Sequence, residues 1–377
     1  MGRLSFANKI GAIFEKSDVV TGLRVDAFTV PTDAPESDGT LKWDKTTIVV
    51  VHITAAGQTG IGYTYADTAT AHLINHTLKP EIVGRDAMDI PACWEAMRRR
   101  IRNLGRPGIV SMAMAAVDNA LWDLKAKRLN LPLVRLLGAD RTEVPIYGSG
   151  GFTSYSMRQL QRQLGGWASQ GMSAVKMKIG RDPARDPERV RAAREAIGPG
   201  VALYVDANGA YSRQQALGLA ERFAPLGVSW FEEPVTSDDR AGLRWLNRRL
   251  PAGMDLAAGE YGYDLSYFQD LLAAGAVTVL QADATRCGGI SEFMRVGALC
   301  AGFHLPFSAH TAPALHLHVC CALAAVRNLE YFHDHVRIEN LLFDGVPRPH
   351  GGLLRPDLTR PGLGIELKRK DAQRYAA

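Results

Sequence analysis

Two kinds of hydrophobic pattern divide the chain. Residues 21–30 and 46–65 alternate apolar and polar side chains, as antiparallel strands do, and Ala56-Gly57-Gln58 supplies a turn within the second stretch. Three stretches with the apolar spacing of helices follow, over residues 67–79, 89–104 and 108–129. This order of a small sheet and then helices predicts an α+β domain over residues 1–140.

The segment between the two alternating stretches has a different composition. Residues 31–45, PTDAPESDGTLKWDK, are polar and rich in Pro, Asp and Gly, which is typical of a loop. We expect this loop to lie over the mouth of the next domain and to set substrate specificity.

From Val144 onward, short apolar strands alternate with helical stretches. Eight strands are predicted, with the sequences VPIYGSG, SAVKMKIG, ALYVDAN, VSWFEEP, DLAAGE, VTVLQAD, FHLPFSAH and LEYF. Seven helical stretches between them predict an α/β fold, a modified TIM barrel of (β/α)7β type over residues 141–344 that lacks a final regular helix. The Gly- and Pro-rich tail, residues 345–377, is expected to return to the N-terminal α+β capping domain.

Polar residues recur at the ends of these strands. They follow one another at intervals of 20–28 residues, the length of one strand and one helix: Lys178, Asp206, Glu232, Glu260, Asp283, His310 and Glu330. The carboxyl ends of the strands of a parallel barrel converge on one face. The sequence therefore predicts an active site at that face.

Three carboxylates, Asp206, Glu232 and Glu260, end three consecutive strands. Each one alone is explained as a surface charge or a helix N-cap, but three in register predict an oxygen-only site for Mg²⁺, with Mn²⁺ as the alternative. Side chains alternate along a strand, so either Glu232 or Glu233 can face the mouth, and we assign Glu232. Asn208, two residues beyond Asp206, is expected to orient a ligand or a bound water.

Five further side chains are candidates for acid–base chemistry and charge stabilisation. Lys176 and Lys178 both point inward, and repulsion between their ammonium groups is expected to lower the pKa of one of them toward that of a base. Lys176 is also expected to neutralise the neighbouring carboxylates. A hydrogen bond from His310 to Asp283 would fix the imidazole tautomer and give a second acid–base group. Glu330 is expected to hydrogen-bond a substrate oxygen, as a protonated acid.

Composition indicates the cellular compartment in which this chemistry takes place and the partners that the protein lacks. The chain has 377 residues, 46% of them apolar, and a net charge of +5. Its five cysteines lack C-x-x-C or paired spacing, which favours a reducing compartment. Lys9, Glu15, Lys16 and Asp18 interrupt any signal-peptide-like stretch, and no apolar run reaches the ~20 residues of a membrane span. The arginine-rich stretch 98–106 lacks interleaved aromatic residues and is interpreted as a solvated helix end.

The residues at the strand ends match a known family. A K-x-K pair, three carboxylates, an Asp–His pair and a late Glu occur in the order found in the mandelate racemase subgroup of the enolase superfamily, which the chain resembles over nearly its whole length. The segments AAVDNALWDLKAK and VSWFEEP are further family-like signatures. The resemblance implies Mg²⁺-dependent removal of the proton α to a carboxylate through a metal-stabilised ene-diolate, for which this superfamily is itself a standard example.

With acid–base groups on both faces of the intermediate, two outcomes are open. We expect dehydration of a sugar acid to a 2-keto-3-deoxy sugar acid by a hydro-lyase, because such dehydratases are common in the subgroup and a polar loop suits a polyhydroxy substrate. A racemase or epimerase of a 2-hydroxy acid and a sugar-lactone cycloisomerase are the alternatives. A non-enzymatic binding protein is disfavoured because no ligand or base is missing.

The expected partner is a small-molecule carboxylate. Four residues are the candidates for substrate contact: Asn208, Trp43, Lys42 and Tyr147. We further expect a cytoplasmic homo-oligomer, with no nucleic-acid or membrane partner.

Overall fold

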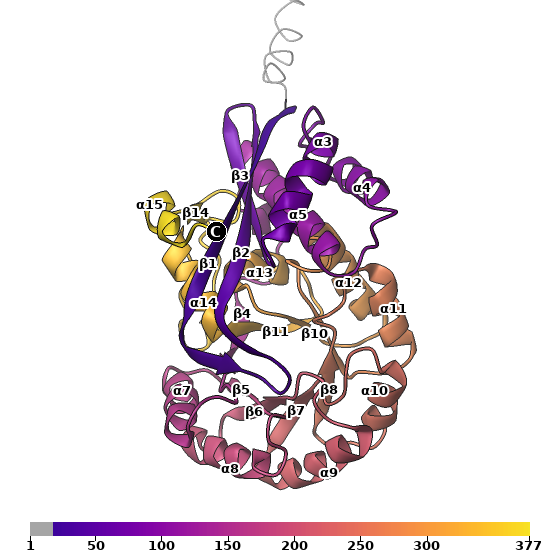
Figure 1. Ribbon diagram of the computed structural model, residues 1–377, viewed down its shortest axis with the longest axis vertical. Coiled ribbons are helices and arrows are strands. Elements are labelled where there is room, and N and C mark those ends of the chain that lie inside the picture. The colour runs from indigo at the N-terminus through magenta and orange to yellow at the C-terminus, as the bar shows by residue number, and fades with distance from the viewer. Residues whose placement is uncertain (1–17) are drawn as a thin grey trace, which may run out of the picture.

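The computed structural model describes residues 18–377 (Figure 1). Lys9, Glu15 and Lys16, on which the expected absence of a signal peptide mostly rests, lie outside the described residues. Within residues 18–377, no helix is both long enough and apolar enough to cross a membrane.

The first part of the chain is a three-stranded antiparallel sheet with helices packed on it. Its strands lie in the order β1 (Val20–Ser37), β2 (Lys42–Ala55) and β3 (Gln58–Tyr65). The helices that follow are α2 (Ala69–Leu73), α3 (Lys79–Ile82), α4 (Ile90–Arg100), α5 (Ile109–Arg128) and α6 (Leu133–Leu137), with a π-helical turn over Ile74–Leu78. The backbone of α5 crosses β3 closely, since a Cβ on Gly62 would lie 2.3 Å from the backbone nitrogen of Ala120.

The expectation of a loop over residues 31–45 is wrong. The segment forms the far ends of β1 and β2, and only the short link between Ser37 and Lys42 is a turn. Pairing shifts register between Pro31 and Glu36, which accommodates the proline-containing stretch as a bulge. Strand pairing continues on both sides of this bulge, so the polar composition does not force a loop. Figure 1 shows this hairpin reaching from the sheet down to the barrel strands.

The second part is a closed parallel barrel. Its eight strands are β4 (Val144–Gly150), β5 (Ala174–Lys178), β6 (Ala202–Asp206), β7 (Val228–Glu232), β8 (Asp255–Ala258), β9 (Val279–Ala282), β10 (Phe307–Ala309) and β11 (Val326–Phe332). Each pairs with the next, and β11 closes on β4. The seventh strand begins at Phe307 and not, as expected, at Phe303, because the chain first leaves the preceding helix through His304 with a left-handed φ of 55°.

Seven helices link the strands. They are α7 (Met157–Ser169), α8 (Asp186–Ile197), α9 (Arg213–Phe223), α10 (Arg240–Asn247), α11 (Leu265–Ala273), α12 (Ile290–Gly302) and α13 (Pro313–Cys320). Helices α7 and α9 begin at capping boxes, Ser156 with Gln159 and Ser212 with Gln215, which satisfy backbone N–H groups of the first turn. A further helix, α14 (His333–Leu342), follows β11 directly.

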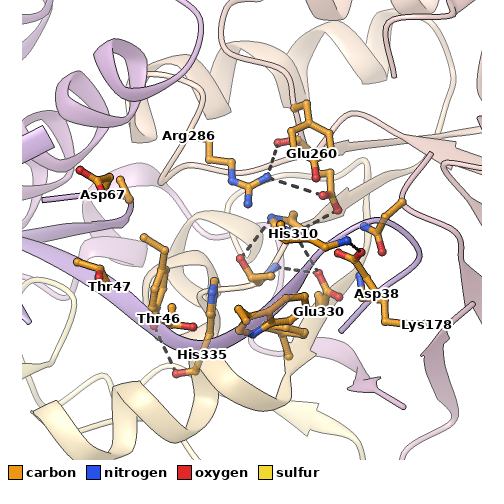
Figure 2. A pocket seen from close by; sticks show the side chains of 18 of the residues that line it. Asp38, Thr46, Thr47, Asp67, Lys178, Glu260, Arg286, His310, Glu330 and His335 are labelled. Atoms are coloured by element: carbon orange, nitrogen blue, oxygen red, sulfur yellow. Dashed lines mark hydrogen bonds and ion pairs between the residues drawn. The ribbon is translucent and has the colours of Figure 1, made fainter. Parts of the chain in front are cut away.

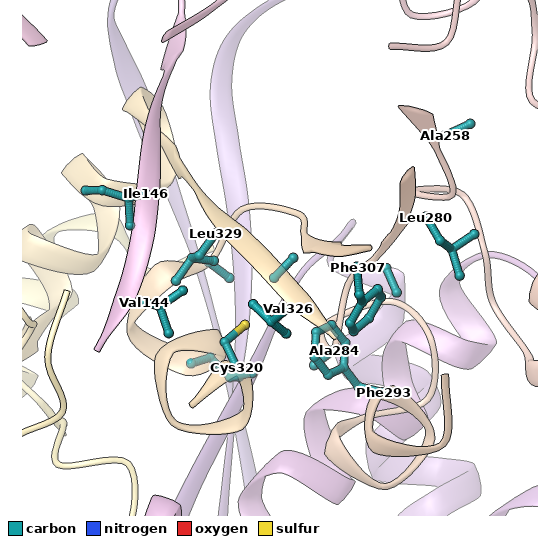
Figure 3. Packing of buried hydrophobic residues seen from close by; sticks show 14 of the residues in the cluster. Val144, Ile146, Ala258, Leu280, Ala284, Phe293, Phe307, Cys320, Val326 and Leu329 are labelled. Carbon is teal, nitrogen blue, oxygen red and sulfur yellow. The ribbon is translucent and has the colours of Figure 1, made fainter. Parts of the chain in front are cut away.

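Apolar side chains fill both sides of the barrel wall. Outward-facing residues of the strands pack against the helices, as Figure 3 shows for Val326 beside Cys320 and for Phe307 beside Phe293. Inside the barrel, a separate aromatic cluster of Tyr147, Tyr204 and Trp230 closes the interior below the mouth. The five cysteines are buried and none forms a disulfide.

The tail touches both parts of the molecule. It contains β12 (Phe343–Asp344), β13 (Leu353–Leu354), β14 (Glu366–Leu367) and α15 (Arg369–Ala372). Strand β13 adds antiparallel to β4, while the backbone N–H of Leu363 donates to Asp123 of α5. The backbone N–H of Ala377 donates to the carbonyl of Ala27 on β1.

Candidate active site

A cavity of about 400 Å³ lies where the hairpin covers the carboxyl ends of the barrel strands. The hairpin supplies Asp38, Leu41, Trp43, Lys45, Thr46 and Thr47, and the strand ends supply Lys178, Asn208, Glu260, Arg286, His310, Thr311 and Glu330. Figure 2 shows Glu260, His310 and Glu330 turned toward one another. The predicted strand-end residues and the predicted covering segment therefore meet at one place.

Asp206, Glu232 and Glu260 form one group, in which Glu260 lines the cavity and Asp206 and Glu232 are fully buried. One oxygen from each lies within 4.8 Å of the others, and all three side chains are buried. Asp206 and Glu232 are paired neighbours on β6 and β7. Glu260 follows Gly259, which has a φ of 133° and no room for a Cβ, since one would lie 2.1 Å from the carbonyl oxygen of Gln281. A glycine is thus needed to turn Glu260 into the mouth.

This carboxylate group fits a divalent cation. Burial and the neighbouring Asp206 charge raise the pKa of Glu232 to about 8, and a bound cation would favour its ionised form. Hard carboxylate oxygens are the ligands that Mg²⁺ prefers. Glu233 is not a member of the group: its φ of 35° takes it out of the strand alternation, and it lines a neighbouring hollow with Tyr267.

Both lysines of β5 are buried among these carboxylates. Lys176 Nζ lies 2.5 Å from Glu232 and 2.8 Å from Glu330, and Lys178 is ion-paired with Asp206. The expectation that mutual repulsion lowers one lysine pKa is wrong for this arrangement. Burial and Lys176 disfavour the Lys178 ammonium, but the carboxylates of Asp206, Glu260 and Glu232 together outweigh them, and the pKa of Lys178 is raised. A cation bound to Asp206 would compete with Lys178 for the same carboxylate.

His310 and Asp283 form the expected pair. His310 Nδ1 lies 2.9 Å from Asp283 Oδ2, and Nε2 lies 3.2 Å from Glu260 Oε2. Burial lowers the pKa of His310, but the Glu260 charge and the Asp283 hydrogen bond outweigh it and raise the pKa to about 9. The imidazolium is therefore the favoured form in this arrangement, with Nε2 beside the Glu260 carboxylate at the cavity.

The surroundings of Glu330 favour its ionised form over the protonated acid that the sequence suggested. Ser149 Oγ donates to it at 2.6 Å, and the backbone N–H of Thr311 donates at 3.1 Å. Burial raises the pKa of Glu330, but Lys176, His310 and Lys178 together outweigh burial and lower the pKa to about 2. Thr311 reaches this position because its φ of 49° bends the chain sharply after β10.

Two of the four candidates for substrate contact line the cavity and two do not. Trp43 and Asn208 line the cavity, whereas Lys42 and Tyr147 do not. Lys42 is exposed on the hairpin, and Tyr147 lies beneath the cavity with its ring 5.3 Å from Lys176 Nζ. Tyr147 is on the inner face of the barrel wall, where it packs against Tyr204 and Trp230.

Arg286 and His335 are among the cavity residues that sequence reasoning did not assign to the site. Arg286 lies three residues after Asp283, and its Nη1 donates to the backbone carbonyl of Glu260 at 3.2 Å. His335 and Tyr65 stack with ring centroids 3.4 Å apart, which joins α14 to β3 at the cavity edge. Arg286 was within reach of the pattern, since it shares a strand-end loop with Asp283. The stacked pair carries no local signal, because its members are 270 residues apart.

Comparisons with known proteins cover almost the whole chain. The mandelate racemase / muconate lactonizing enzyme N-terminal domain matches residues 25–138, and the enolase C-terminal domain-like family matches residues 159–372. A solved mandelate racemase/muconate lactonizing enzyme-like protein from Rubrobacter xylanophilus is 57% identical, with a TM-score of 0.94 over 95% of this chain and 100% of that one.

Two relatives carry more specific names. The 3,6-anhydro-alpha-L-galactonate cycloisomerase of Streptomyces coelicolor is 32% identical over 93% of this chain and 97% of its own. The L-talarate/galactarate dehydratase of Salmonella typhimurium is 30% identical over 94% and 91%. A solved variant of an L-talarate/galactarate dehydratase, liganded with Mg and L-glucarate, has a TM-score of 0.87 and 28% identity over 95% of this chain and 92% of that one.

Proposed function

This chain belongs to the mandelate racemase subgroup of the enolase superfamily, and from that premise we propose that it is a Mg²⁺-dependent hydro-lyase that dehydrates a sugar acid to a 2-keto-3-deoxy sugar acid. The observation that carries the proposal is a group of three buried carboxylates whose member Glu260 lines one cavity together with an acid–base group from each of two well-separated strands. Relatives named as sugar-acid dehydratases support the reaction type.

Asp206, Glu232 and Glu260 would hold the Mg²⁺. When bound, the ion would supply Lewis-acid stabilisation of the negative charge that develops on the substrate carboxylate as the α-proton leaves. Lys176 lies next to this group and donates a hydrogen bond to the same charge, while Glu330, fixed by Ser149 and Thr311, holds Lys176 in place.

Lys178 and His310 act from different sides of the substrate. They line the same cavity from the second and seventh strands of the barrel. Lys178 removes the α-proton, leaving a planar ene-diolate, and His310 donates its Nε2 proton to the β-hydroxyl as the carbon–oxygen bond breaks, so that water leaves. Asp283 keeps the His310 ring oriented for this transfer. The enol that results becomes the 2-keto-3-deoxy acid when C3 takes up a proton.

The lining of the cavity favours a polyhydroxy substrate. Asp38, Lys45, Thr46 and Thr47 of the hairpin face it together with Arg286, and each can hydrogen-bond a hydroxyl or a carboxylate. An aromatic 2-hydroxy acid would need an apolar surface, which this cavity offers mainly at Leu41 and Trp43. The guanidinium of Arg286 also suits the second carboxylate of a diacid sugar.

The cellular compartment, the oligomeric state and the partners are part of the same proposal. We place the protein in the cytoplasm as a homo-oligomer with no nucleic-acid or membrane partner. Five free cysteines support a reducing compartment. Arg98 and Arg99, in the arginine-rich stretch, are ion-paired with Glu95 on the same helix, so they are not held free for a polyanion. Light scattering coupled to size exclusion tests the oligomer.

A substrate screen tests the reaction. The protein is incubated with Mg²⁺ and a panel of mono- and diacid sugars, and 2-keto-3-deoxy product is measured, with Lys178→Ala as the inactive control. The proposal expects product from at least one sugar acid and none after EDTA treatment. Consumption of an anhydro sugar acid or lactone alone would identify a cycloisomerase. Deuterium entering recovered substrate without net dehydration would identify a racemase or epimerase.

A further inference from the structure

A second group of metal-binding side chains lies outside the cavity. Asp33 and Glu36 of β1 and His333, the first residue of α14, each place one possible ligand atom within 4.8 Å of the others. His333 Nε2 already lies 3.0 Å from Asp33 Oδ2. The group therefore joins the covering hairpin to the end of the eighth barrel strand, 297 to 300 residues away along the chain.

The buried member of this group has an unused ligand atom. Glu36 is 1% exposed, although its neighbours in the group are partly open to solvent. Trp43 Nε1 donates to Glu36 Oε2 at 2.7 Å, and Oε1 has no hydrogen-bond partner in the part of the chain that the structure describes. A buried carboxylate oxygen without a partner is costly, and a cation is one group that can satisfy it.

The electrostatic surroundings agree with this geometry. The carboxylates of Asp334 and Asp33 lie close enough to Glu36 to add to its negative electrostatic surroundings. Arg337 is the cation near this group, and its Nη2 is already engaged by Asp334 Oδ1 at 2.7 Å and the carbonyl of Pro31 at 2.6 Å. The region thus has more carboxylates than cations to balance them.

We propose that Asp33, Glu36 and His333 form a second metal site, distinct from the Mg²⁺ site, that binds a transition-metal dication of the Zn²⁺ type. One imidazole nitrogen and two carboxylates suit Zn²⁺ or Co²⁺, whereas Mg²⁺ prefers oxygen ligands alone. This difference in ligand chemistry allows the two sites to be filled independently.

The bound ion fastens the hairpin over the cavity. His333 follows Phe332, which lines the cavity, and Glu36 holds Trp43, which lines it from the hairpin. An ion shared by His333 and Glu36 links these two walls directly. The site is structural: it fixes the cover and takes no part in proton transfer.

Metal binding tests the proposal without reference to turnover, so its failure is separate from failure of the proposed function. The full-length protein is stripped of metal, saturated with Mg²⁺ and titrated with Co²⁺, while the visible absorption of the Co²⁺ ion is followed. We expect one equivalent of Co²⁺ to bind in the presence of Mg²⁺, and Asp206→Asn to leave this binding intact.

Three further variants locate the ion. His333→Asn and Glu36→Gln should each weaken Co²⁺ binding by at least ~10-fold, as loss of a single supporting group does at other metal sites. His76→Asn is the matched control, because it removes an imidazole from the stacked pair His72 and His76 elsewhere on the surface. Binding that survives His333→Asn, or that is lost with His76→Asn, would overturn the assignment.

The wild-type protein alone gives an independent readout. Zn²⁺ added in saturating Mg²⁺ should slow amide hydrogen exchange over residues 31–37 and leave the remote helix α9 unchanged. Unchanged exchange in the hairpin, or no Co²⁺ uptake by the Mg²⁺-saturated protein, would mean that Glu36 is simply a buried acid hydrogen-bonded to Trp43 and that His333 and Asp33 form an ordinary surface pair.

Discussion

Of the two adjacent glutamates at the end of β7, only one belongs to the proposed Mg²⁺ site. Glu232 faces Asp206 and Glu260, whereas Glu233 leaves the strand with a left-handed φ and lies outside this group. Loss of a residue that hydrogen-bonds to a metal ligand lowers metal affinity by roughly 10–100-fold. Glu232 is itself a proposed ligand, so Glu232→Gln should weaken Mg²⁺ binding by more than that. Glu233→Gln is the matched control and should keep the affinity within a few-fold. Calorimetric titration with Mg²⁺ measures both, and the reverse ranking would shift the assigned register by one residue.

Glu339 makes folding stability depend on pH. It accepts hydrogen bonds from Tyr63 Oη at 2.6 Å and the backbone of Ala314 at 3.2 Å, and burial raises its pKa from 4.5 to about 8. The folded state therefore holds this proton more tightly than the unfolded state. Its stabilising contribution is complete below pH 4.5 and is lost as the pH rises toward 8.

Glu339→Gln should flatten that dependence. The free energy of unfolding of the wild type should fall between pH 4.5 and 8 relative to that of the variant, because glutamine keeps a neutral side chain at this position. Urea unfolding at several pH values measures this, with the exposed Glu366→Gln as the control. Parallel pH profiles for the wild type and Glu339→Gln would show that Glu339 ionises without penalty.

At the scale of the element, the hairpin of β1 and β2 positions the cover of the cavity. Trp43 packs edge-on against Phe152, with ring centroids 5.6 Å apart, and lines the cavity, while neighbouring Lys42 is exposed. Trp43→Ala should lower kcat/KM without loss of Mg²⁺ affinity, because a cover excludes water and completes the site. Lys42→Ala should change kcat/KM little. Steady-state kinetics that rank the two variants the other way would contradict this arrangement.

The hairpin also shows where composition misleads. Pro31, Asp38 and Gly39 are turn-forming residues, and they predicted a loop. The structure keeps the turn at Asp38, whose carboxylate accepts from the backbone N–H groups of Thr40 and Leu41, both at 2.6 Å. The flanking residues are strands because they pair with each other and contact the barrel, and neither contact has a local signature.

At the scale of the whole molecule, the strand-end pattern was sufficient to predict the barrel and the family. Alternation along each strand and a regular interval between polar strand ends are local properties, so the sequence specified that Asp206, Glu232 and Glu260 share one face. The charge states were not predictable in the same way. Lys178 and Glu330 take their pKa shifts from Asp206 and Lys176, and those shifts depend on distances that only the closed barrel defines.

The central claim is that Lys178 removes the α-proton of a substrate bound in the cavity and that His310 protonates the β-hydroxyl as it leaves. Positioned acid–base groups contribute ~10²- to 10⁴-fold, so Lys178→Ala and His310→Asn should each suppress turnover by that order, while His304→Asn, at an exposed histidine, should not. The two inactive variants should differ in the reaction that survives.

Proton NMR of a sugar-acid substrate in D₂O, with Mg²⁺ and each variant in turn, tests this claim most directly. We expect His310→Asn to exchange the α-proton of the substrate for deuterium without dehydration, and Lys178→Ala to do neither. Exchange that survives only in Lys178→Ala would make His310 the base, and wild-type rates of exchange and dehydration in both variants would mean that neither residue carries the chemistry.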